Sequence, residues 1–286
     1  MERAARSEEM EYSLAVAAAD PLDEQALRQE LLRPGSLWRR LDVVAEIGST
    51  NADLADLARA GAESGSVLIA DYQAAGRGRQ GRVWTAPSGS GIAMSVLLRP
   101  EGVPASRWTW LPLIAGLAVA EGLRRASGVP AVLKWPNDVL VREQKICGIL
   151  AERVETPTGA ACVVGIGVNV GLQADDLPVP TATSLAILAG EDPRIVVPPR
   201  NQLIATVLAA FELLYLRWEE PAAQASLAAA YLERSATIGR RVRVLLAGDR
   251  EVEGLAETID PDGRLVLRTE HGREVVSAGD VTNLRS

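Results

Sequence analysis

Cysteine and histidine are scarce in this sequence of 286 residues, and their scarcity removes several kinds of chemistry. The chain has two cysteines, Cys147 and Cys162, and one histidine, His271. Zinc clusters and disulfide frameworks need more of these residues, and a histidine-based triad is disfavoured for the same reason. Both cysteines lie in apolar, strand-like stretches, so we expect buried thiols. Catalysis would therefore use lysine, arginine, backbone groups or a metal held by oxygen atoms.

An excess of positive charge and long apolar stretches are also absent. The net charge of -7 at pH 7 disfavours binding to nucleic acid over a wide surface. The longest apolar stretches, such as residues 111–120, are too short to span a bilayer. The N-terminus lacks the basic and apolar regions of a signal peptide. We therefore expect a cytoplasmic protein that binds neither DNA nor membranes.

The Gly-x-x-x-x-Gly-Lys-Ser/Thr loop that binds phosphate in many ATPases is missing. Residues 165–169 read Gly-Ile-Gly-Val-Asn and partly match a dinucleotide-binding motif, but the third glycine, Gly171, comes one position late. No helix follows at once either. We interpret these glycines as places where a ligand approaches the backbone of a strand. An ATP site in this chain must be of another kind.

What the sequence does have is a run of glycine and arginine at residues 76–82, closely followed by Trp84. Glycine lets the backbone approach a ligand, and arginine brings a permanent, forked positive charge suited to phosphate or carboxylate. The run contains no carboxylate, so it predicts a local anion site in an acidic protein. The alternative is a solvated turn with surface arginines. Arg77 and Arg79 are two residues apart, so an extended segment would point both to the same side.

The apolar pattern predicts an α+β fold with a mixed sheet. Strands are expected at 41–47, 66–72, 92–98, 132–135, 139–141, 145–154 and 161–170, with helices at 23–32, 108–126, 201–218 and 222–233 and after residues 49–51. Beyond Ser235, short strands at 241–246, 251–259, 264–269 and 273–277 predict a small β-barrel. The predicted units are an N-terminal helical or flexible lead (1–40), a catalytic domain (41–234) and the barrel (235–286).

Three other places carry polar groups beside apolar strands. Residues 49–51, Ser-Thr-Asn, fit a helix N-cap, and a helix N-terminus also offers N–H groups to a polar ligand. Lys134 and Lys145 each stand at the end of a strand, where a lysine can simply extend into solvent. Within residues 134–138, Lys-Trp-Pro-Asn-Asp, a lysine and two oxygen-bearing side chains are suited to hold a phosphate beside a magnesium ion.

These groups fit acyl adenylation, in which a carboxylate attacks the α-phosphate of ATP. The two anions repel each other, and arginine, lysine and Mg²⁺ would offset that repulsion. Trp84 presents an aromatic face on which an adenine can stack.

Five motifs in the same order give the chain a resemblance to the biotin protein ligases, from about Ile47 to the C-terminus. They are residues 49–51, 76–82 with Trp84, 134–138, 145–150 and 165–169. The resemblance implies a catalytic domain similar to class II aminoacyl-tRNA synthetases, followed by an SH3-like barrel. It also implies an ATP-dependent biotin–[acetyl-CoA carboxylase] ligase, which makes biotinyl-5′-AMP from biotin and MgATP. Biotin would then pass to one lysine of a biotin carboxyl carrier domain.

The resemblance implies three sets of site residues. Biotin would be bound by Ser49, Thr50, Asn51, Gln73, Arg77, Gly78, Arg79, Lys145 and Gly148. ATP and the adenylate would be bound by Arg77, Arg79, Arg82, Trp84, Lys134 and Asn169. Arg79, Lys134 and Lys145 would act in catalysis, and Asn137 would help to hold Mg²⁺. The loop around Arg79 would close over biotin and the adenylate.

Two alternatives remain beside this interpretation. A lipoate or octanoate ligase or transferase would share the fold, although residues 76–82 and 134–138 favour biotin. A non-catalytic, biotin-responsive regulator is disfavoured by the retained Lys134 and Lys145. Many biotin protein ligases also carry an N-terminal helix-turn-helix, for which too few residues precede Ile47. We therefore expect a ligase without a DNA partner, as a monomer or a weak homodimer.

Overall fold

The computed structural model describes residues 20–284, so residues 1–19 of the predicted N-terminal lead lie outside the described residues. Seven strands form one large sheet in the order β1-β2-β3-β7-β6-β5-β4. They are β1 (Arg40–Ile47), β2 (Ser66–Gln73), β3 (Gly91–Leu98), β4 (Val132–Lys134), β5 (Asp138–Val141), β6 (Gln144–Thr156) and β7 (Gly159–Asn169). Only β1 and β2 run parallel; the other neighbours are antiparallel. The predicted mixed sheet is confirmed.

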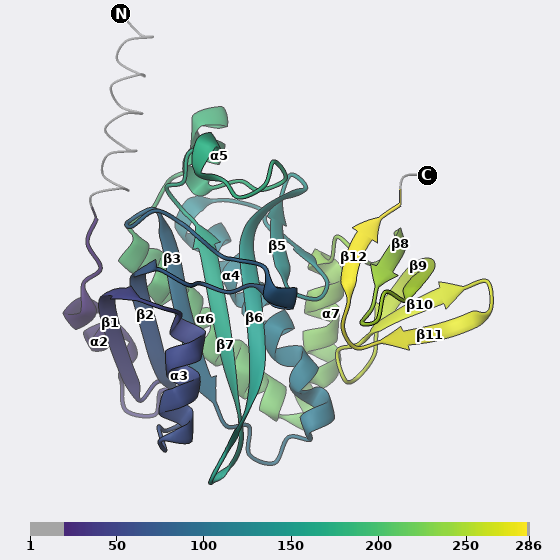
Figure 1. Ribbon diagram of the computed structural model, residues 1–286, viewed down its shortest axis with the longest axis horizontal. Helices are drawn as coiled ribbons and strands as arrows, with labels where there is room; N and C mark the ends of the chain where they lie inside the picture. Colours follow the sequence, from purple (N-terminus) through teal and green to yellow (C-terminus); the bar gives the residue numbers. More distant parts are fainter. Residues whose placement is uncertain (1–19, 285–286) are drawn as a thin grey trace, which may run out of the picture.

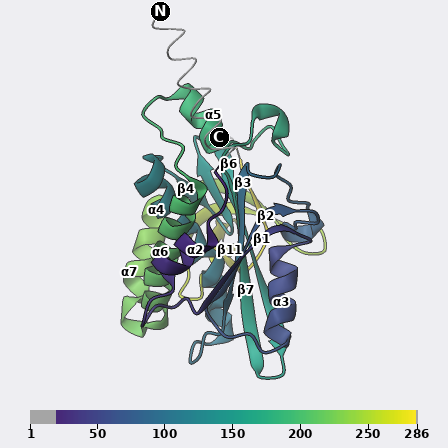
Figure 2. The ribbon, with the colours of Figure 1, turned by 90° about the vertical axis from the view of Figure 1, so that its left-hand side faces the viewer.

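Helices cover both faces of this sheet (Figures 1 and 2). One side carries α2 (Glu24–Leu31), α4 (Trp110–Ser127), α6 (Arg200–Glu219) and α7 (Gln224–Arg234), whereas α3 (Thr50–Arg59) lies on the other. Strand alternation explains the two layers, because Val164 and Ile166 of β7 join the large core and Val163 joins a smaller core under α3. All of the predicted helices are confirmed within the described residues.

A second sheet follows α7 and has the strand order β11-β10-β9-β8-β12. Its strands are β8 (Arg241–Leu245), β9 (Glu251–Ile259), β10 (Leu265–Thr269), β11 (Gly272–Val276) and β12 (Asp280–Asn283), and every pairing is antiparallel. This small all-β unit confirms the predicted barrel. The sequence predicted neither β12 nor the short helix α5 (Leu185–Glu191). Short 3-10 turns at Arg79–Gly81, Ala105–Thr109, Ala174–Asp176 and Pro221–Ala223 complete the structure.

The barrel is attached to the large sheet at β4 and α4. Trp135 is 1% exposed; its backbone N–H donates to Thr237 Oγ1 at 3.0 Å and its indole N–H to the carbonyl of Gly263 at 3.2 Å. The indole N–H of Trp110 donates to the carbonyl of Pro261 at 2.9 Å. Barrel residues also belong to the large hydrophobic core. The domain division at residue 235 stays a prediction, and the contacts across it are extensive.

Among residues 20–284, no helix combines the length and the apolar character needed to cross a bilayer.

Candidate functional site

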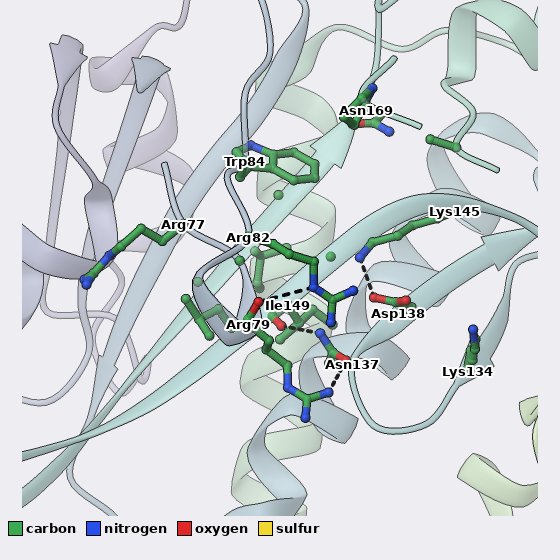
Figure 3. Close-up of a pocket in the computed structure, with 18 of the residues that line it drawn as sticks. Arg77, Arg79, Arg82, Trp84, Lys134, Asn137, Asp138, Lys145, Ile149 and Asn169 are labelled. Carbon is green, nitrogen blue, oxygen red and sulfur yellow. Dashed lines mark hydrogen bonds and ion pairs between the residues drawn. The ribbon is translucent and has the colours of Figure 1, made fainter. Parts of the chain in front are cut away.

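A pocket of about 520 Å³ opens between the large sheet and the barrel. Its lining contains every residue that the sequence predicted for the site, and the barrel adds Asp280, Val281 and Thr282. The volume lies in the range typical of small-molecule sites. Side chains from strands that are far apart in the sequence therefore meet in one place (Figure 3).

Glycines form the floor of this pocket. Strand alternation directs one face of β7 to the pocket, and Gly165 and Gly167 occupy that face. A Cβ at Gly167 would lie 2.6 Å from the ring of Trp84, and one at Gly165 would lie 2.3 Å from Oδ1 of Asn51. A Cβ at Gly148 of β6 would lie 3.1 Å from Nζ of Lys145. The strand glycines thus let the side chains of Trp84, Asn51 and Lys145 lie directly on the sheet. The sequence had predicted only that a ligand approaches the backbone at these glycines.

The Ser-Thr-Asn motif lies at the start of α3, and its polar atoms belong to a buried network. The backbone N–H and hydroxyl of Thr50 donate to Oε1 of Gln73 at 2.8 and 3.0 Å. Ser95 Oγ lies 2.6 Å from Asn51 Oδ1 and 2.7 Å from Thr50 Oγ1. The amide of Asn51 donates to Glu152 at 2.7 Å. Residues 95 and 152 were missed from the sequence because each looks like an ordinary strand position.

Ser49 occupies the N-cap position of α3, but its side chain makes no capping hydrogen bond. Gln73 satisfies the N–H of Thr50 instead. Ser49 therefore stands at the predicted N-cap position, but the hydrogen bond expected from an N-cap side chain is absent. Ser49 itself belongs to the pocket lining.

The arginine loop, defined here as residues 74–83, turns sharply at a 3-10 turn where Gln80 has a φ of 54°. The prediction that Arg77 and Arg79 point to the same side is wrong, because the segment is not extended beyond Gly78. Nη2 of Arg77 lies 3.8 Å from the carboxylate of Glu152, while Arg79 points toward Asn137 (Figure 3). The two arginines thus contact different sides of the pocket, Arg77 at β6 and Arg79 at the turn between β4 and β5.

Arg79 and Arg82 connect the loop to β4–β5 and to the barrel. Nη1 of Arg79 donates to Oδ1 of Asn137 at 2.9 Å and to the carbonyl of Gly279 at 3.2 Å. Arg82 forms an ion pair with Asp280, which also lies 3.7 Å from Arg79. Burial lowers the pKa of Arg79, and the charge of Asp280 opposes that shift. Asp280 was missed from the sequence, where nothing relates it to a loop 198 positions away.

The only two lysines of the chain both line the pocket. Nζ of Lys145 lies 2.6 Å from Oδ1 of Asp138, so this ammonium is held in place by a neighbouring strand. Lys134, at the end of β4, lies apart from that pair (Figure 3), and no carboxylate among residues 20–284 is within ion-pairing distance of it. Lys134 is thus the less constrained of the two positive charges.

Two asparagines close the pocket from the strand ends. Asn169 is buried and donates from its amide to the carbonyl of Thr183 at 2.8 Å. Asn137 donates to the carbonyl of Ile149 at 2.9 Å while accepting from Arg79. Within the described part of the chain, no group of three or more His, Cys, Asp or Glu side chains is arranged to hold a metal.

The cysteines are buried, as predicted. Burial raises the pKa of the Cys162 thiol to about 12 and raises that of Cys147 further. Neither thiol lines the pocket.

Comparison with known proteins places this chain in one family. Residues 43–169 match the model of the Biotin/lipoate A/B protein ligase family, and residues 237–282 match that of the biotin protein ligase C terminal domain. The chain belongs to this family and, with its C-terminal barrel, to the biotin protein ligases.

Individual relatives agree. The chain is 48% identical to the biotin--[acetyl-CoA-carboxylase] ligase of Mycobacterium tuberculosis, over 93% of this chain and 97% of the relative. It is 36% identical to the enzyme of the same name from Paracoccus denitrificans, covering 84% and 98% of the two chains. A solved structure of the biotin protein ligase from Aquifex aeolicus in complex with biotin and ATP is similar with a TM-score of 0.73 and 28% identity, over 87% and 100% of the chains.

Proposed function

We propose that this protein is a biotin–protein ligase that activates biotin with ATP to biotinyl-5′-AMP. It then transfers biotin to a lysine of the biotin carboxyl carrier domain of an acyl-CoA carboxylase. One observation carries the proposal: in a member of this family, five motif segments that are distant in the sequence line a single pocket. The names of the relatives and the ligands of the Aquifex aeolicus structure support the same activity.

The head group of biotin is assigned to the end of the pocket near α3. Its ureido ring offers a carbonyl and two N–H groups, which need hydrogen-bonding partners when they leave water. Thr50, Asn51 and Gln73 supply polar atoms there; Ser95 orients Thr50 and Asn51, and Gln73 accepts from Thr50. The missing side chains at Gly165 and Gly167 let Asn51 and Trp84 lie against β7, so these two side chains border the proposed head-group site.

The first reaction joins the biotin carboxylate to the α-phosphorus of ATP and releases pyrophosphate. Lys134, Lys145, Arg79 and Arg82 bring positive charge to the pocket, which offsets the repulsion between the two anions and stabilises the growing charge at phosphorus. Asp138 orients the ammonium of Lys145. Trp84 offers its ring to the adenine.

Magnesium enters this scheme with its nucleotide, as MgATP. Mg²⁺ keeps several waters and phosphate oxygens as ligands and needs few protein groups. Asn137 stays a prediction as a magnesium ligand, and its surroundings fit that role poorly. Its amide oxygen already accepts a bond from Arg79, whose positive charge would repel a cation.

In the second reaction the amine of the acceptor lysine attacks the acyl carbon of the mixed anhydride, and AMP leaves. Water attacks the same carbon, so the pocket must exclude water until the acceptor arrives. The arginine loop lies beside Trp84 at the pocket and is placed to cover the intermediate.

Incubation with biotin, MgATP and a biotin carboxyl carrier domain, read by streptavidin blot, tests the proposal. We expect labelling that needs ATP and is lost when the acceptor lysine is replaced by arginine. Lipoate and octanoate, supplied in parallel and read by mass spectrometry, should not be transferred. Absence of biotin labelling would contradict the proposed function, and transfer of lipoate in its place would select the alternative ligase.

A further inference from the structure

A buried arginine outside the pocket joins both ends of the segment that carries the arginine loop. Arg200, the first residue of α6, is 2% exposed. Its Nη1 donates to Oδ1 of Asp71 at 2.6 Å and to the carbonyl of Gly91 at 3.3 Å. Asp71 lies near the end of β2, Gly91 begins β3, and residues 74–90 run between these strands. One guanidinium thus contacts the strand that leads into the segment and the strand that leaves it.

The carboxylate of Asp71 extends this contact to the segment itself. One of its oxygens accepts from Arg200, and the other accepts from the hydroxyl of Ser88. Burial raises the pKa of Asp71, but the bonds from Ser88 and Arg200 outweigh burial and hold the pKa below its ordinary value. The ionised carboxylate therefore belongs to a clamp made of Arg200, Asp71 and Ser88.

The clamp is continuous with the pocket. A small hollow beside it is lined by Asp71 and Gly91 of the clamped strands and by Gln73, Trp84 and Ala86. Gln73 in turn holds the N-terminus of α3, and Trp84 lies on the floor glycine Gly167. A shift of the clamped strand ends would therefore displace Trp84 and Gln73 first.

We propose that Arg200 is a positioning residue for the adenylation and transfer steps, an inference that rests on the proposed function. Through Asp71 and the carbonyl of Gly91 it fixes the two strand ends between which the arginine loop is suspended, and through Asp71 it also holds Ser88 of the segment between them. The loop and Trp84 are thereby held over the intermediate without any contact between Arg200 and a substrate. Arg200 also bonds to Asp20, so a role in stability alone has to be separated from positioning by experiment.

Three substitutions weaken the clamp in different ways. Arg200→Lys keeps the positive charge but loses the planar fork that reaches two acceptors. Asp71→Asn keeps the shape and removes the negative charge. Ser88→Ala removes one hydroxyl at an exposed position and should leave folding intact.

Arg99→Gln is the matched control. Arg99 follows the opposite end of β3 and donates to the carbonyls of Ala58 and Ala62 and to Thr156 Oγ1. It is thus a comparable arginine with several bonds to neighbouring segments, and it does not line the pocket.

The readout is the amount of biotinyl-5′-AMP released into solution per biotin transferred to the acceptor, measured beside thermal unfolding. Small displacements of groups around a reacting centre change rates by about 10- to 100-fold, so we expect release to rise by about tenfold in the three clamp variants. The KM for ATP should rise with it, because Trp84 moves, while Arg99→Gln lowers thermal stability without changing the release ratio.

Three results would overturn the inference. An unchanged release ratio and KM in Ser88→Ala and Asp71→Asn, with active wild-type protein, would leave the proposed function standing and remove the clamp. A wild-type protein that forms no adenylate would remove both. A rise in Arg99→Gln equal to that in the clamp variants would reduce Arg200 to a stabilising residue.

Discussion

At position 167 a hydrogen atom stands where any other residue would place a carbon against the ring of Trp84. The tryptophan reaches the sheet only because β7 has no side chain there. A strand glycine usually weakens a sheet, since it packs nothing and costs conformational entropy. Its presence inside β7, two residues before the end of an eleven-residue strand, therefore indicates a requirement of the pocket and not of the fold.

Gly167→Ala should displace Trp84 and weaken ATP binding. A Cβ would lie 2.6 Å from the indole, which is too close for any relaxed contact. Losing a stacking contact with a base costs about 1–3 kcal/mol, so we expect the KM for ATP to rise by roughly 10- to 100-fold. Gly171→Ala is the control, because its Cβ would meet Ser90 at an ordinary 3.6 Å. Equal KM values in both variants would argue against stacking by Trp84.

Lys134→Ala should block adenylation. Lys134 is a pocket charge without a carboxylate partner among the described residues, so its charge is available to a phosphate. We expect biotin-dependent exchange of pyrophosphate into ATP to fall by about 10²- to 10³-fold, as when one group that stabilises developing charge is removed. Lys134→Arg, which keeps the charge, should retain part of the activity. Normal exchange in Lys134→Ala would remove this residue from the mechanism.

At the scale of single elements, the arginine loop differs from a simple basic turn. Its arginines reach Glu152, Asn137 and Asp280 on three separate walls, so the loop is held by contacts that a solvated turn would lack. The sequence indicated that residues 76–82 contribute to a site. It also predicted that Arg77 and Arg79 point to the same side, which is wrong. A rule for extended chain does not apply where Gln80 takes a left-handed conformation.

Arg79→Gly should let the adenylate escape. The substitution removes the bonds to Asn137 and to the carbonyl of Gly279, which are contacts of the loop with two other segments. We expect biotinyl-5′-AMP to appear in solution, measured by chromatography without acceptor, at a rate about tenfold or more above wild type. Full retention of the adenylate by the variant would show that the loop does not cover it.

The last turns of α4 predict a pH dependence of stability. Glu121 pairs with Arg124 and Arg125 at 2.8 and 2.6 Å, and the hydrogen bond from Arg124, with that from Arg125, lowers the pKa of Glu121 from 4.5 to about 2. A lowered folded pKa means that the unfolded state binds more protons between pH 4.5 and about 2. The contribution of Glu121 is therefore complete above pH 4.5 and is lost as pH falls toward 2.

Thermal unfolding of Glu121→Gln and wild type across that range measures this contribution. The difference in Tm should be largest at neutral pH and should shrink as pH falls below 4.5. A difference independent of pH would mean that packing, and not charge, is what Glu121 provides.

Most elements followed from apolar periodicity, and the ones that did not are short or depend on distant partners. The helix Leu185–Glu191 has seven residues, too few to show a clear helical period. The strand Asp280–Asn283 alternates over four residues and is a strand because it pairs with β8. Ser95, Glu152 and Arg200 show the same limit for the site. Each has a polar role set by a partner more than forty residues away, which composition and spacing do not reveal.

At the scale of the whole molecule, the barrel is part of the pocket, because Asp280, Val281 and Thr282 belong to its lining. Its strand β12 supplies Asp280 to the arginine loop, while Thr237 and Gly263 hold Trp135 next to Lys134. Barrel residues that lie more than a hundred positions away in the sequence thereby help to position Lys134, Arg79 and Arg82.

Asp280→Asn should impair catalysis more than stability. The Asp280 side chain is 31% exposed, and partly exposed ion pairs contribute at most about 1 kcal/mol, so the Tm should change little. The loop loses its charged partner for Arg82, and we expect a several-fold slower transfer of biotin with more released adenylate. Glu253→Gln breaks the exposed pair with Arg243 on the barrel, at 2.7 Å, and serves as the control. Equal activities of the two variants would mean that the ion pair between Asp280 and the arginine loop does not contribute to catalysis.

The placement of both lysines in the pocket has a consequence for chemical labelling. All other basic side chains except His271 are arginines, whose guanidinium groups resist acylation at neutral pH because they stay protonated. An activated ester added to the folded protein, or an escaped mixed anhydride, thus finds only the two lysines that line the pocket. Apart from the α-amino group, any amine of this protein that becomes acylated therefore lies in the pocket. The decrease in lysine acylation after addition of biotin and ATP would measure the fraction of pockets that are occupied.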